Sequence, residues 1–348
     1  MKPALRRGAL VLIVLLLGSF LLFSSLVRQA ALEGLGLCAK VLVPSLFPFC
    51  VLSNLLILMG CDRSLGRRTG RLMPALFGVS PNGAAALFLG CVGGFPVGAM
   101  TIARLYSRGS ITRDDACRLS AFCCNAGPAF LLGAAGAHLL GSATAGALLL
   151  SVHLLAAVLT GMLLSGGSAP VRREAPSPPQ PPLPFSAAFP QAVSQGCTGM
   201  VQLCGFVVFF SVILALAGRL PVGDNLLRLL AGVLEVSCGI ESLQGLADFP
   251  AFVSAAAVLG WSGLCVHCQT AFVLQGCGLK LRSYLRGKLL HTALSVLLAV
   301  PAALLWGVLS CRPALPTVKQ ALLAPALAAV AGLLLLFSKR GVEKPDTI

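Results

Sequence analysis

Runs of about twenty apolar residues recur from one end of this sequence to the other, and they constrain the fold more than any other feature. A run of that length, wound as an α-helix, crosses a hydrocarbon core roughly 30 Å thick. The runs are continuous and do not alternate with period two, which excludes an outer-membrane barrel. We therefore predict an all-α polytopic membrane protein. Uninterrupted spans are expected at residues 8–27, 35–60, 118–140, 143–165, 196–218, 225–246, 289–310 and 319–338.

Composition supports this class and leaves no room for a sizeable soluble domain. Hydrophobic residues make up 57% of the chain, charged residues make up 11%, and the mean hydropathy is +0.91. The net charge of +15 comes from Lys and Arg in short loops between the spans, as cytoplasmic loops show. No basic helix or aromatic platform accompanies this charge, so we expect a lipid bilayer around the chain and no nucleic-acid partner.

The 14 cysteines lie mostly inside apolar segments, where free cysteine behaves as a small hydrophobe. They show no pairing pattern in the loops, which argues against a disulfide framework. The stretch "CVHC", Cys265 to Cys268, has no second pair at zinc spacing. We therefore expect no metal site and no cofactor.

The chain divides at a proline-rich stretch near its middle, "GGSAPVRREAPSPPQPPLPF", whose prolines favour an extended linker. The N-terminus has the charged start and apolar run of a signal peptide but no small-x-small cleavage site, so we interpret it as a retained anchor. The predicted parts are an N-terminal transmembrane helix (1–30), a first repeat (31–165), the linker (166–189), a second repeat (190–340) and a C-terminal tail (341–348).

A weak internal repeat supports this division. When "LGCVGGFPVGAMTIARLYSRG" is aligned with "LGWSGLCVHCQTAFVLQGCG", three positions match, and each stretch runs into a basic loop. Both halves also contain an interrupted apolar stretch, at 73–105 and 250–278. The basic loops of both halves favour one side of the membrane, which implies parallel repeats, whereas inverted repeats would place them on opposite sides. The sequence leaves both arrangements open.

The breaks in these apolar stretches are the first candidate functional feature. Irregular backbone at membrane depth occurs where protein or a wet cavity satisfies it, and duplicated halves with broken helices are typical of secondary transporters. Residues 73–105 are too short for two full spans and should enter and leave on one side, as a re-entrant hairpin. A kinked helix or a tight helix crossing is the alternative. The candidate residues of the first break are Gly93, Gly94, Phe95 and Pro96.

Polar side chains within the spans are the second candidate feature, because they are costly there. Glu235 lies mid-span and either carries a proton or cation, contacts substrate, or pairs with a helix neighbour. His267 and Gln269 follow the second break and either bind a polar ligand or join helices. Ser120 and Asn125 precede a second Gly-Pro break at Gly127 and Pro128. Metalloprotease, serine-hydrolase and phosphate-loop motifs are missing from the sequence, so we expect no enzyme.

The stretches "PSLFPF", "GGFPVGA", "CNAGPAFLLG", "VLEVSCGI" and "GWSGLCVHCQ", in this order, resemble the sporulation integral membrane proteins of the YlbJ (SpoVV) type. These are grouped with the nucleoside recognition, or Gate-domain, membrane proteins. The resemblance covers about residues 35–336. It implies transport of dipicolinic acid across the outer forespore membrane during endospore formation. It also implies the inverted repeats and re-entrant hairpins of concentrative nucleoside transporters.

A dipicolinate substrate is compatible with the residues. The N-termini of broken helices offer N–H groups to carboxylates. Ser237, Ser262, His267 and Gln269 can add hydrogen bonds, whereas Glu235 would repel a dianion and is assigned a structural or coupling role. Two alternatives stay open, namely a transporter of nucleosides or other metabolites and a non-transporting sporulation scaffold. A preference for nucleosides over a pyridine dicarboxylate would select the first of them.

Overall fold

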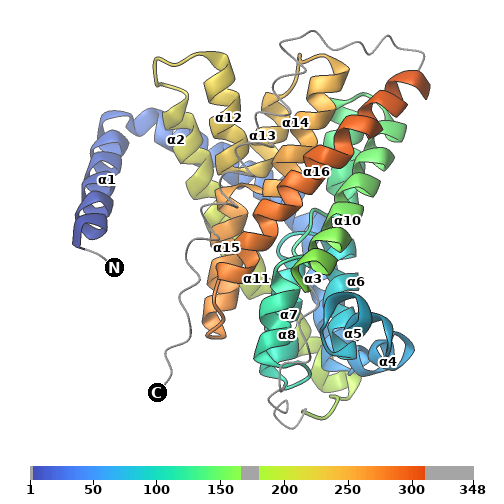
Figure 1. Cartoon of the computed structure of the whole chain (residues 1–348). Coiled ribbons are helices and arrows are strands. Elements are labelled where there is room, and N and C mark those ends of the chain that lie inside the picture. Colours follow the sequence, from blue (N-terminus) through green and yellow to red (C-terminus); the bar gives the residue numbers. More distant parts are fainter. Residues whose placement is uncertain (1–2, 166–179, 310–348) are drawn as a thin grey trace.

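All regular structure in the described part of the chain, residues 3–165 and 180–309, is helical in the computed structural model (Figure 1). Five helical segments are long and apolar enough to cross a membrane. They are Ser24–Leu58, Ala143–Ser165, Phe185–Ala217, Asp248–Gly276 and Arg282–Gly307. The prediction of an all-α polytopic membrane protein is therefore confirmed, and the chain is an integral membrane protein.

The first half begins with α1 (Pro3–Leu22) and a long span in which α2 (Ser24–Leu37) continues through a π-helical turn into α3 (Val43–Leu58). Two short helices, α4 (Cys61–Arg68) and α5 (Leu72–Phe77), lead to α6 (Ala84–Gly93) and α7 (Val97–Ser107). A broken helix, which we call broken helix 1, follows. In it α8 (Arg113–Ser120) is separated by residues 121–127 from α9 (Pro128–Phe130) and its π-helical continuation Leu131–Leu139. The span α10 (Ala143–Ser165) ends this half.

The second half repeats this order without the short helices. A long span, α11 (Phe185–Ala217), precedes the pair α12 (Asp224–Leu234) and α13 (Val236–Ser242). Broken helix 2 follows, formed by α14 (Asp248–Trp261) and α15 (Gly263–Gly276), with its break at Ser262. The last helix is α16 (Arg282–Leu309). In each half, a long helix is thus followed by a helical pair, a broken helix and a second long helix.

The helical pairs are hairpins. In hairpin 1, α6 and α7 fold back on each other at Gly94–Pro96, and glycines lie between them: a Cβ added to Gly90 would be 3.3 Å from the Cα of Gly98. In hairpin 2, α12 and α13 fold back at Glu235, and a Cβ on Gly239 would be 2.6 Å from the Cα of Gly232. The re-entrant hairpin predicted within residues 73–105 is present, as α6 and α7.

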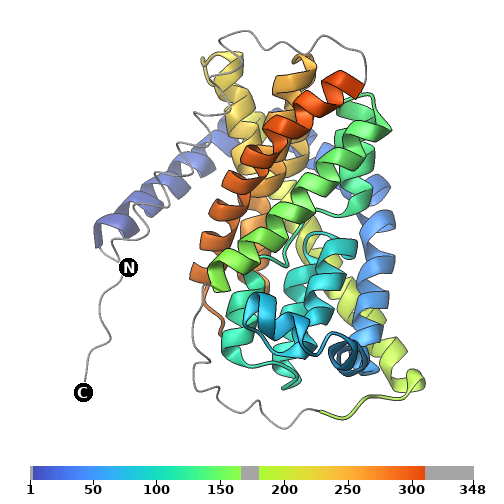
Figure 2. The ribbon, with the colours of Figure 1, turned by 45° about the vertical axis from the view of Figure 1, so that its right-hand side comes forward.

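The two halves are inverted with respect to each other. Gly34 lies beside Ser211, whereas the Asn54 side chain donates to the carbonyl of Ala192, 3.2 Å away, so α2–α3 and α11 run antiparallel. The last helices, α10 and α16, lie side by side and also run in opposite directions (Figures 1 and 2). Corresponding long helices therefore cross the molecule in opposite senses, which answers the question that the sequence left open.

The structure also corrects the sequence alignment of the repeats. The GGFP break of hairpin 1 corresponds in element order to Glu235 in hairpin 2, and the break at Ser262 corresponds to residues 121–127. The basic loop before α16 then has its counterpart in the turn before α10, which carries no Lys or Arg. The expectation that inverted repeats would separate the basic loops is therefore wrong.

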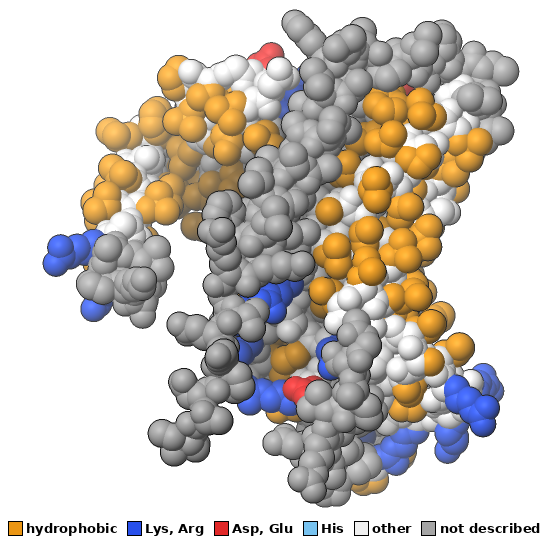
Figure 3. All heavy atoms as spheres, viewed as in Figure 1, with side chains coloured by type: hydrophobic (Ala, Val, Ile, Leu, Met, Phe, Trp, Pro, Cys, Tyr) orange, Lys and Arg blue, Asp and Glu red, His pale blue; other side chains and the backbone are white. Residues whose placement is uncertain are grey.

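The basic loops lie together at one end of the molecule (Figure 3). Arg113, the first residue of α8, donates to the carbonyl of Gly278 in the loop before α16, 2.8 Å away. Arg63 and Arg108 both donate to the carbonyl of Gln180. We call this end the basic face, and the positive-inside rule predicts that it faces the cytoplasm. Its members are Arg63, Arg67, Arg68, Arg71, Arg108, Arg113, Arg118, Lys280, Arg282 and Arg286.

Three predicted spans are wrong. Residues 8–27 do not form one helix, because α1 ends at Leu22 and α2 begins at Ser24. Residues 118–140 do not form one helix, because the chain unwinds at 121–127 before the Gly127–Pro128 pair, and proline cannot continue a helix that precedes it. Residues 225–246 form hairpin 2, because Glu235 adopts an extended conformation and its side chain caps the next helix. The predicted span at 319–338 and the tail lie outside the described residues, and the boundaries of the five predicted parts stay a prediction.

Broken helix 2 forms the centre of the molecule. In the most apolar 18-residue stretch of this helix 83% of the residues are buried, whereas the same measure is 28% to 39% for the other four candidate spans. It packs against α16, and Gly260 allows the close approach, because a Cβ there would be 2.8 Å from the Cα of Thr292. The long outer helices present apolar side chains outward, as lipid-facing helices do, so the broken helix is the element shielded from lipid.

Candidate functional site

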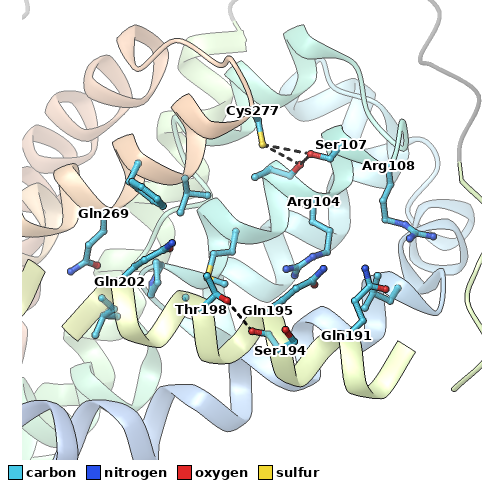
Figure 4. Close-up of a pocket in the computed structure, with 18 of the residues that line it drawn as sticks. Arg104, Ser107, Arg108, Gln191, Ser194, Gln195, Thr198, Gln202, Gln269 and Cys277 are labelled. Carbon is cyan, nitrogen blue, oxygen red and sulfur yellow. Dashed lines mark hydrogen bonds between the residues drawn. The ribbon is translucent and has the colours of Figure 1, made fainter. Parts of the chain in front are cut away.

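A pocket of about 460 Å³ opens between α7, α11 and α15 (Figure 4). It reaches from Ser107 and Cys277, at the basic face, to Pro96 at the break of hairpin 1. At ~1.5 Å per residue, the stretch from Pro96 to Ser107 rises roughly 16 Å, about half of a ~30 Å hydrocarbon core. The pocket therefore ends near the middle of the membrane, at the predicted break.

One face of α11 supplies most of the polar lining. Its polar residues recur at helical spacing and share one side of an otherwise apolar helix. A polar stripe on a membrane helix faces a cavity or another helix, because lipid cannot hydrogen bond to it. In the described structure the side-chain oxygen of Gln195 is buried without a hydrogen-bond partner. The members of the stripe are Gln191, Ser194, Gln195, Thr198 and Gln202.

Two arginines on the opposite side of the pocket carry its charge. Arg104 in α7 donates to the side-chain oxygen of Asn54, whose amide in turn donates to the backbone of α11. Arg108 donates to the carbonyl of Pro181, 2.8 Å away. Figure 4 shows both arginines on the same wall of the pocket. Arg104 belongs to helix α7, and Arg108 caps the end of that helix, so the first basic loop begins after Arg104.

The charge of the pocket suits an anionic ligand. Among the described residues, 3–165 and 180–309, the lining includes two arginines and no Asp or Glu. Hydrogen bonds from arginine to carboxylate are charge-assisted and stronger than neutral ones, and arginine can bind a carboxylate through two parallel N–H groups. The amides and hydroxyls of α11 can donate to further oxygens. The pocket volume lies within the range usual for small-molecule sites, roughly 300–1,000 Å³.

Only two of the predicted substrate-binding residues line this pocket, Pro96 and Gln269. Gln269 is buried, and its amide lies 3.3 Å from the sulfur of Cys265. Next to Pro96, the ring of Phe95 lies under the amine of Lys288, with 5.3 Å between the nitrogen and the ring centroid. The first break thus touches the pocket on one side and a buried amine on the other.

The other candidates of the first half lie at the contact between hairpin 1 and broken helix 1. Gly93 ends α6, and Gly94 has a left-handed φ of +76°. A Cβ on Gly94 would be 2.8 Å from the backbone nitrogen of Gly127, so the two breaks touch through backbone. Ser120 bonds back to the carbonyl of Cys117 within its own helix. Asn125 is fully buried and donates to the carbonyl of Phe122, 2.9 Å away.

The candidates of the second half lie at the equivalent contact between hairpin 2 and broken helix 2. A Cβ on Gly263 would be 2.9 Å from the backbone nitrogen of Val236, next to Glu235. Glu235 accepts from the backbone N–H of Cys238 at 2.8 Å and so caps α13. Ser262 is fully buried at φ +77° and bonds to the carbonyl of Leu259. The structure thus brings the breaks together in pairs, one pair in each half.

Two further candidates of the second half lie away from the pocket lining. Ser237, half-buried in α13, and the buried His267 are both outside it. The Nδ1 atom of His267 lies 2.7 Å from the hydroxyl of Tyr284, which joins α15 to α16. For His267 this is the interhelical role that was weighed against ligand binding.

Sequence reasoning missed the α11 stripe and the pocket position of Arg104. The signal was present in "QAVSQGCTGMVQ", where polar residues recur at intervals of three and four within an apolar run. Because α11 contains no break, this spacing is the only sequence signal of the stripe. Arg104 closely follows the break of hairpin 1 and precedes other arginines, a pattern that also fits a basic loop.

Comparison with known proteins confirms the resemblance predicted from the sequence. The chain is 28% identical over 339 residues to the sporulation integral membrane protein YlbJ of Bacillus subtilis (strain 168). The aligned region covers 84% of this chain and 82% of the relative. No protein-family model matches the chain, and no solved structure matches it. The similarity supports a YlbJ-type assignment and a membrane role in sporulation.

Proposed function

We propose that the protein transports a small anionic metabolite, and that this substrate is dipicolinic acid moved across the outer forespore membrane during endospore formation. The observation that carries the proposal is the pocket between α7, α11 and α15. In the described part of the chain its lining has two arginines and no acidic residue, and it ends at a broken hairpin near the bilayer centre. Transporters of inverted-repeat type bind their substrates at such places.

The pocket chemistry fits a planar dicarboxylate. One carboxylate can accept from the Arg104 guanidinium, which already bonds to Asn54 and is thereby held in place. The second carboxylate can accept from the amides of the α11 stripe or from Gln269. The substrate is bound and released without chemical change, so we propose no catalytic residue.

Inversion of the two halves gives a physical route for release on the other side. Each half has a hairpin that contacts a broken helix through backbone, at Gly94 with Gly127 and at Gly263 with Glu235. The pocket beside hairpin 1 opens toward the basic face. It can close while the equivalent region beside hairpin 2 opens toward the opposite face, because the two regions have the same architecture. The transport cycle then exchanges the roles of the two hairpins.

The test is uptake of labelled dipicolinate into proteoliposomes that contain the purified protein. Saturable uptake, lost in Gln269→Ala and competed by unlabelled dipicolinate better than by uridine, is the expected result. Gln275→Ala serves as the control, because Gln275 is an exposed glutamine of the same helix, α15, and lies outside the pocket lining. Stronger competition by uridine would select a nucleoside transporter. Folded protein without uptake of either compound would favour a membrane scaffold.

A further inference from the structure

Lys288 is a buried amine at the junction of the two halves. It lies in α16, within a membrane-spanning segment, and only 1% of its surface is exposed. Its amine donates to the carbonyl of Cys124, 3.2 Å away, in the unwound part of broken helix 1. The same nitrogen is 3.5 Å from Nδ1 of His291 and 5.3 Å from the centroid of the Phe95 ring.

The groups around Lys288 are basic or neutral. His291 faces it from α16, His153 from α10 and His267 from α15, while Cys124 faces it from the unwound segment. Within residues 3–165 and 180–309 no carboxylate lies within ion-pair distance of the amine. A charge at this depth without a counter-ion is expensive, so the protonated state of Lys288 depends closely on its surroundings.

The hydrogen bonds around Lys288 define where a proton can be held. The backbone N–H of Ala126 donates to Nε2 of His153, so that ring carries its hydrogen on Nδ1 and is neutral. When the Lys288 amine donates to Nδ1 of His291, the Nε2–H of His291 donates to the carbonyl of His153, 3.0 Å away. Both histidines are then neutral. An additional proton in the cluster is then held by the amine of Lys288, and Nδ1 of His291 is the nearest side-chain acceptor.

A bound proton on Lys288 is linked to the candidate substrate pocket. The ammonium form is attracted to the face of the Phe95 ring, whereas the neutral amine is not. Phe95 adjoins Pro96, which lines the pocket, and Cys124 belongs to the segment against which hairpin 1 packs. Loss of the proton therefore weakens the hold of α16 on both hairpin 1 and broken helix 1.

We propose that Lys288 is the binding site for a proton that is transported together with the anionic substrate. In one state of the transport cycle the amine takes up the proton from one side of the membrane, and in the other state it releases the proton to the other side. No covalent bond other than the N–H bond forms or breaks. The coupling rests on the proposed function, whereas the proton site itself does not. A carboxylate is not the ligand of Lys288, because its donors already face Cys124, His291 and Phe95 and it lies outside the pocket lining.

The first experiment needs no substrate. Hydrogen exchange of residues 94–97 and 121–127 is measured at mildly acidic and mildly alkaline pH, after correction for intrinsic exchange rates. We expect greater protection at acidic pH in the wild type, no pH difference in Lys288→Gln, and a wild-type pattern in Lys40→Gln. Lys40 is an exposed lysine of another span and is the matched control. A wild type without the pH difference, or a Lys288→Gln variant that keeps it, would overturn the proposal.

The second experiment tests coupling in proteoliposomes. An inward proton gradient of one pH unit should raise dipicolinate accumulation about tenfold per cotransported proton, and Lys288→Gln should lose this effect while it retains exchange of internal for external dipicolinate. Wild-type exchange without an effect of the gradient would refute coupling. If the wild type does not exchange internal for external dipicolinate, dipicolinate is refuted as the substrate. The hydrogen-exchange experiment then still tests the proton site by itself. If Lys288→Gln does not fold, Lys288→Arg, which keeps its charge, should show protection that is independent of pH.

Discussion

Gly98→Ala tests whether the close contact between hairpin 1 and broken helix 1 holds the molecule together. A Cβ at Gly98 would overlap the carbonyl oxygen of Cys123, and it would lie 3.0 Å from the carbonyl carbon of Cys123 and 3.3 Å from the Cα of Cys124. A Cβ at Gly90 would overlap the same oxygen from the other arm of the hairpin. The Cys123 carbonyl is therefore enclosed by two glycines, so a methyl group on either of them can be accommodated only if this carbonyl is displaced.

The cost of this substitution follows from what it meets. The neighbouring atoms are backbone and cannot rotate away, so the hairpin or the unwound segment must shift. Overpacking of this kind typically costs about 1–3 kcal/mol. For chains of a few hundred residues each kcal/mol lowers the melting temperature by roughly 2–4 °C, so we expect a decrease of about 2–12 °C. Dipicolinate uptake should fall as well, because Pro96 and the pocket wall move with the hairpin.

The assay is thermal unfolding of the purified protein in detergent, paired with uptake into proteoliposomes. Gly205→Ala is the matched control, because it is also a glycine-to-alanine change in a helix, and a Cβ there meets nothing within 4 Å. The control should be as stable as the wild type or slightly more so, since alanine favours helix by about 0.8–1.0 kcal/mol. Equal melting temperatures and equal uptake for the two variants would refute the reasoning.

Three further substitutions test other parts of the site. Arg104→Gln should weaken dipicolinate binding, measured by calorimetry, by about 10–150-fold, because a hydrogen bond to a charged group is lost. Arg68→Gln, on the exposed basic face, should leave the affinity unchanged. Equal affinities of the two variants would argue against an anion site. Glu235→Ala should lower the free energy of unfolding by ~1 kcal/mol through loss of a helix cap, and Glu235→Gln should restore both stability and uptake; an inactive, stable Glu235→Gln would show a coupling role instead. Gly263→Ala should be destabilised in thermal unfolding relative to Gly276→Ala, because Gly263 has φ +78° and would place a Cβ 2.9 Å from hairpin 2, and unchanged stability would contradict this.

The long helices and the existence of breaks could be predicted because both depend on local sequence. Continuous apolar runs give spans, and the Gly-Gly-Phe-Pro stretch interrupts α6 and α7 wherever it lies in the fold. Glu235 was noticed as a costly residue at membrane depth, but its effect on the backbone was not. Its carboxylate caps α13 and so turns a predicted span into a hairpin, an outcome that depends on hydrogen bonding between residues three positions apart.

The pocket and the inversion of the halves could not be predicted, because both depend on which elements meet. The similarity between residues 89–109 and 259–278 paired a hairpin with a broken helix, since both contain glycine before a basic loop. Lys288 lies at the start of an apolar run in the sequence, yet it is buried and bonds to Cys124, which is more than a hundred residues away in the sequence. Tertiary contacts of this kind leave little trace in a single sequence.

The collection of positive charge at one end has a consequence for how the chain enters the membrane during synthesis. Two inverted halves of the same build have no preferred sense of insertion, and a protein of this kind could in principle be made in either orientation. The basic segments of this face belong to both halves, at 63–71 and 108–118 in the first and 280–286 in the second. Each half therefore resists translocation of the same end, so the whole population inserts in one sense and every pocket with Arg104 opens to the same compartment.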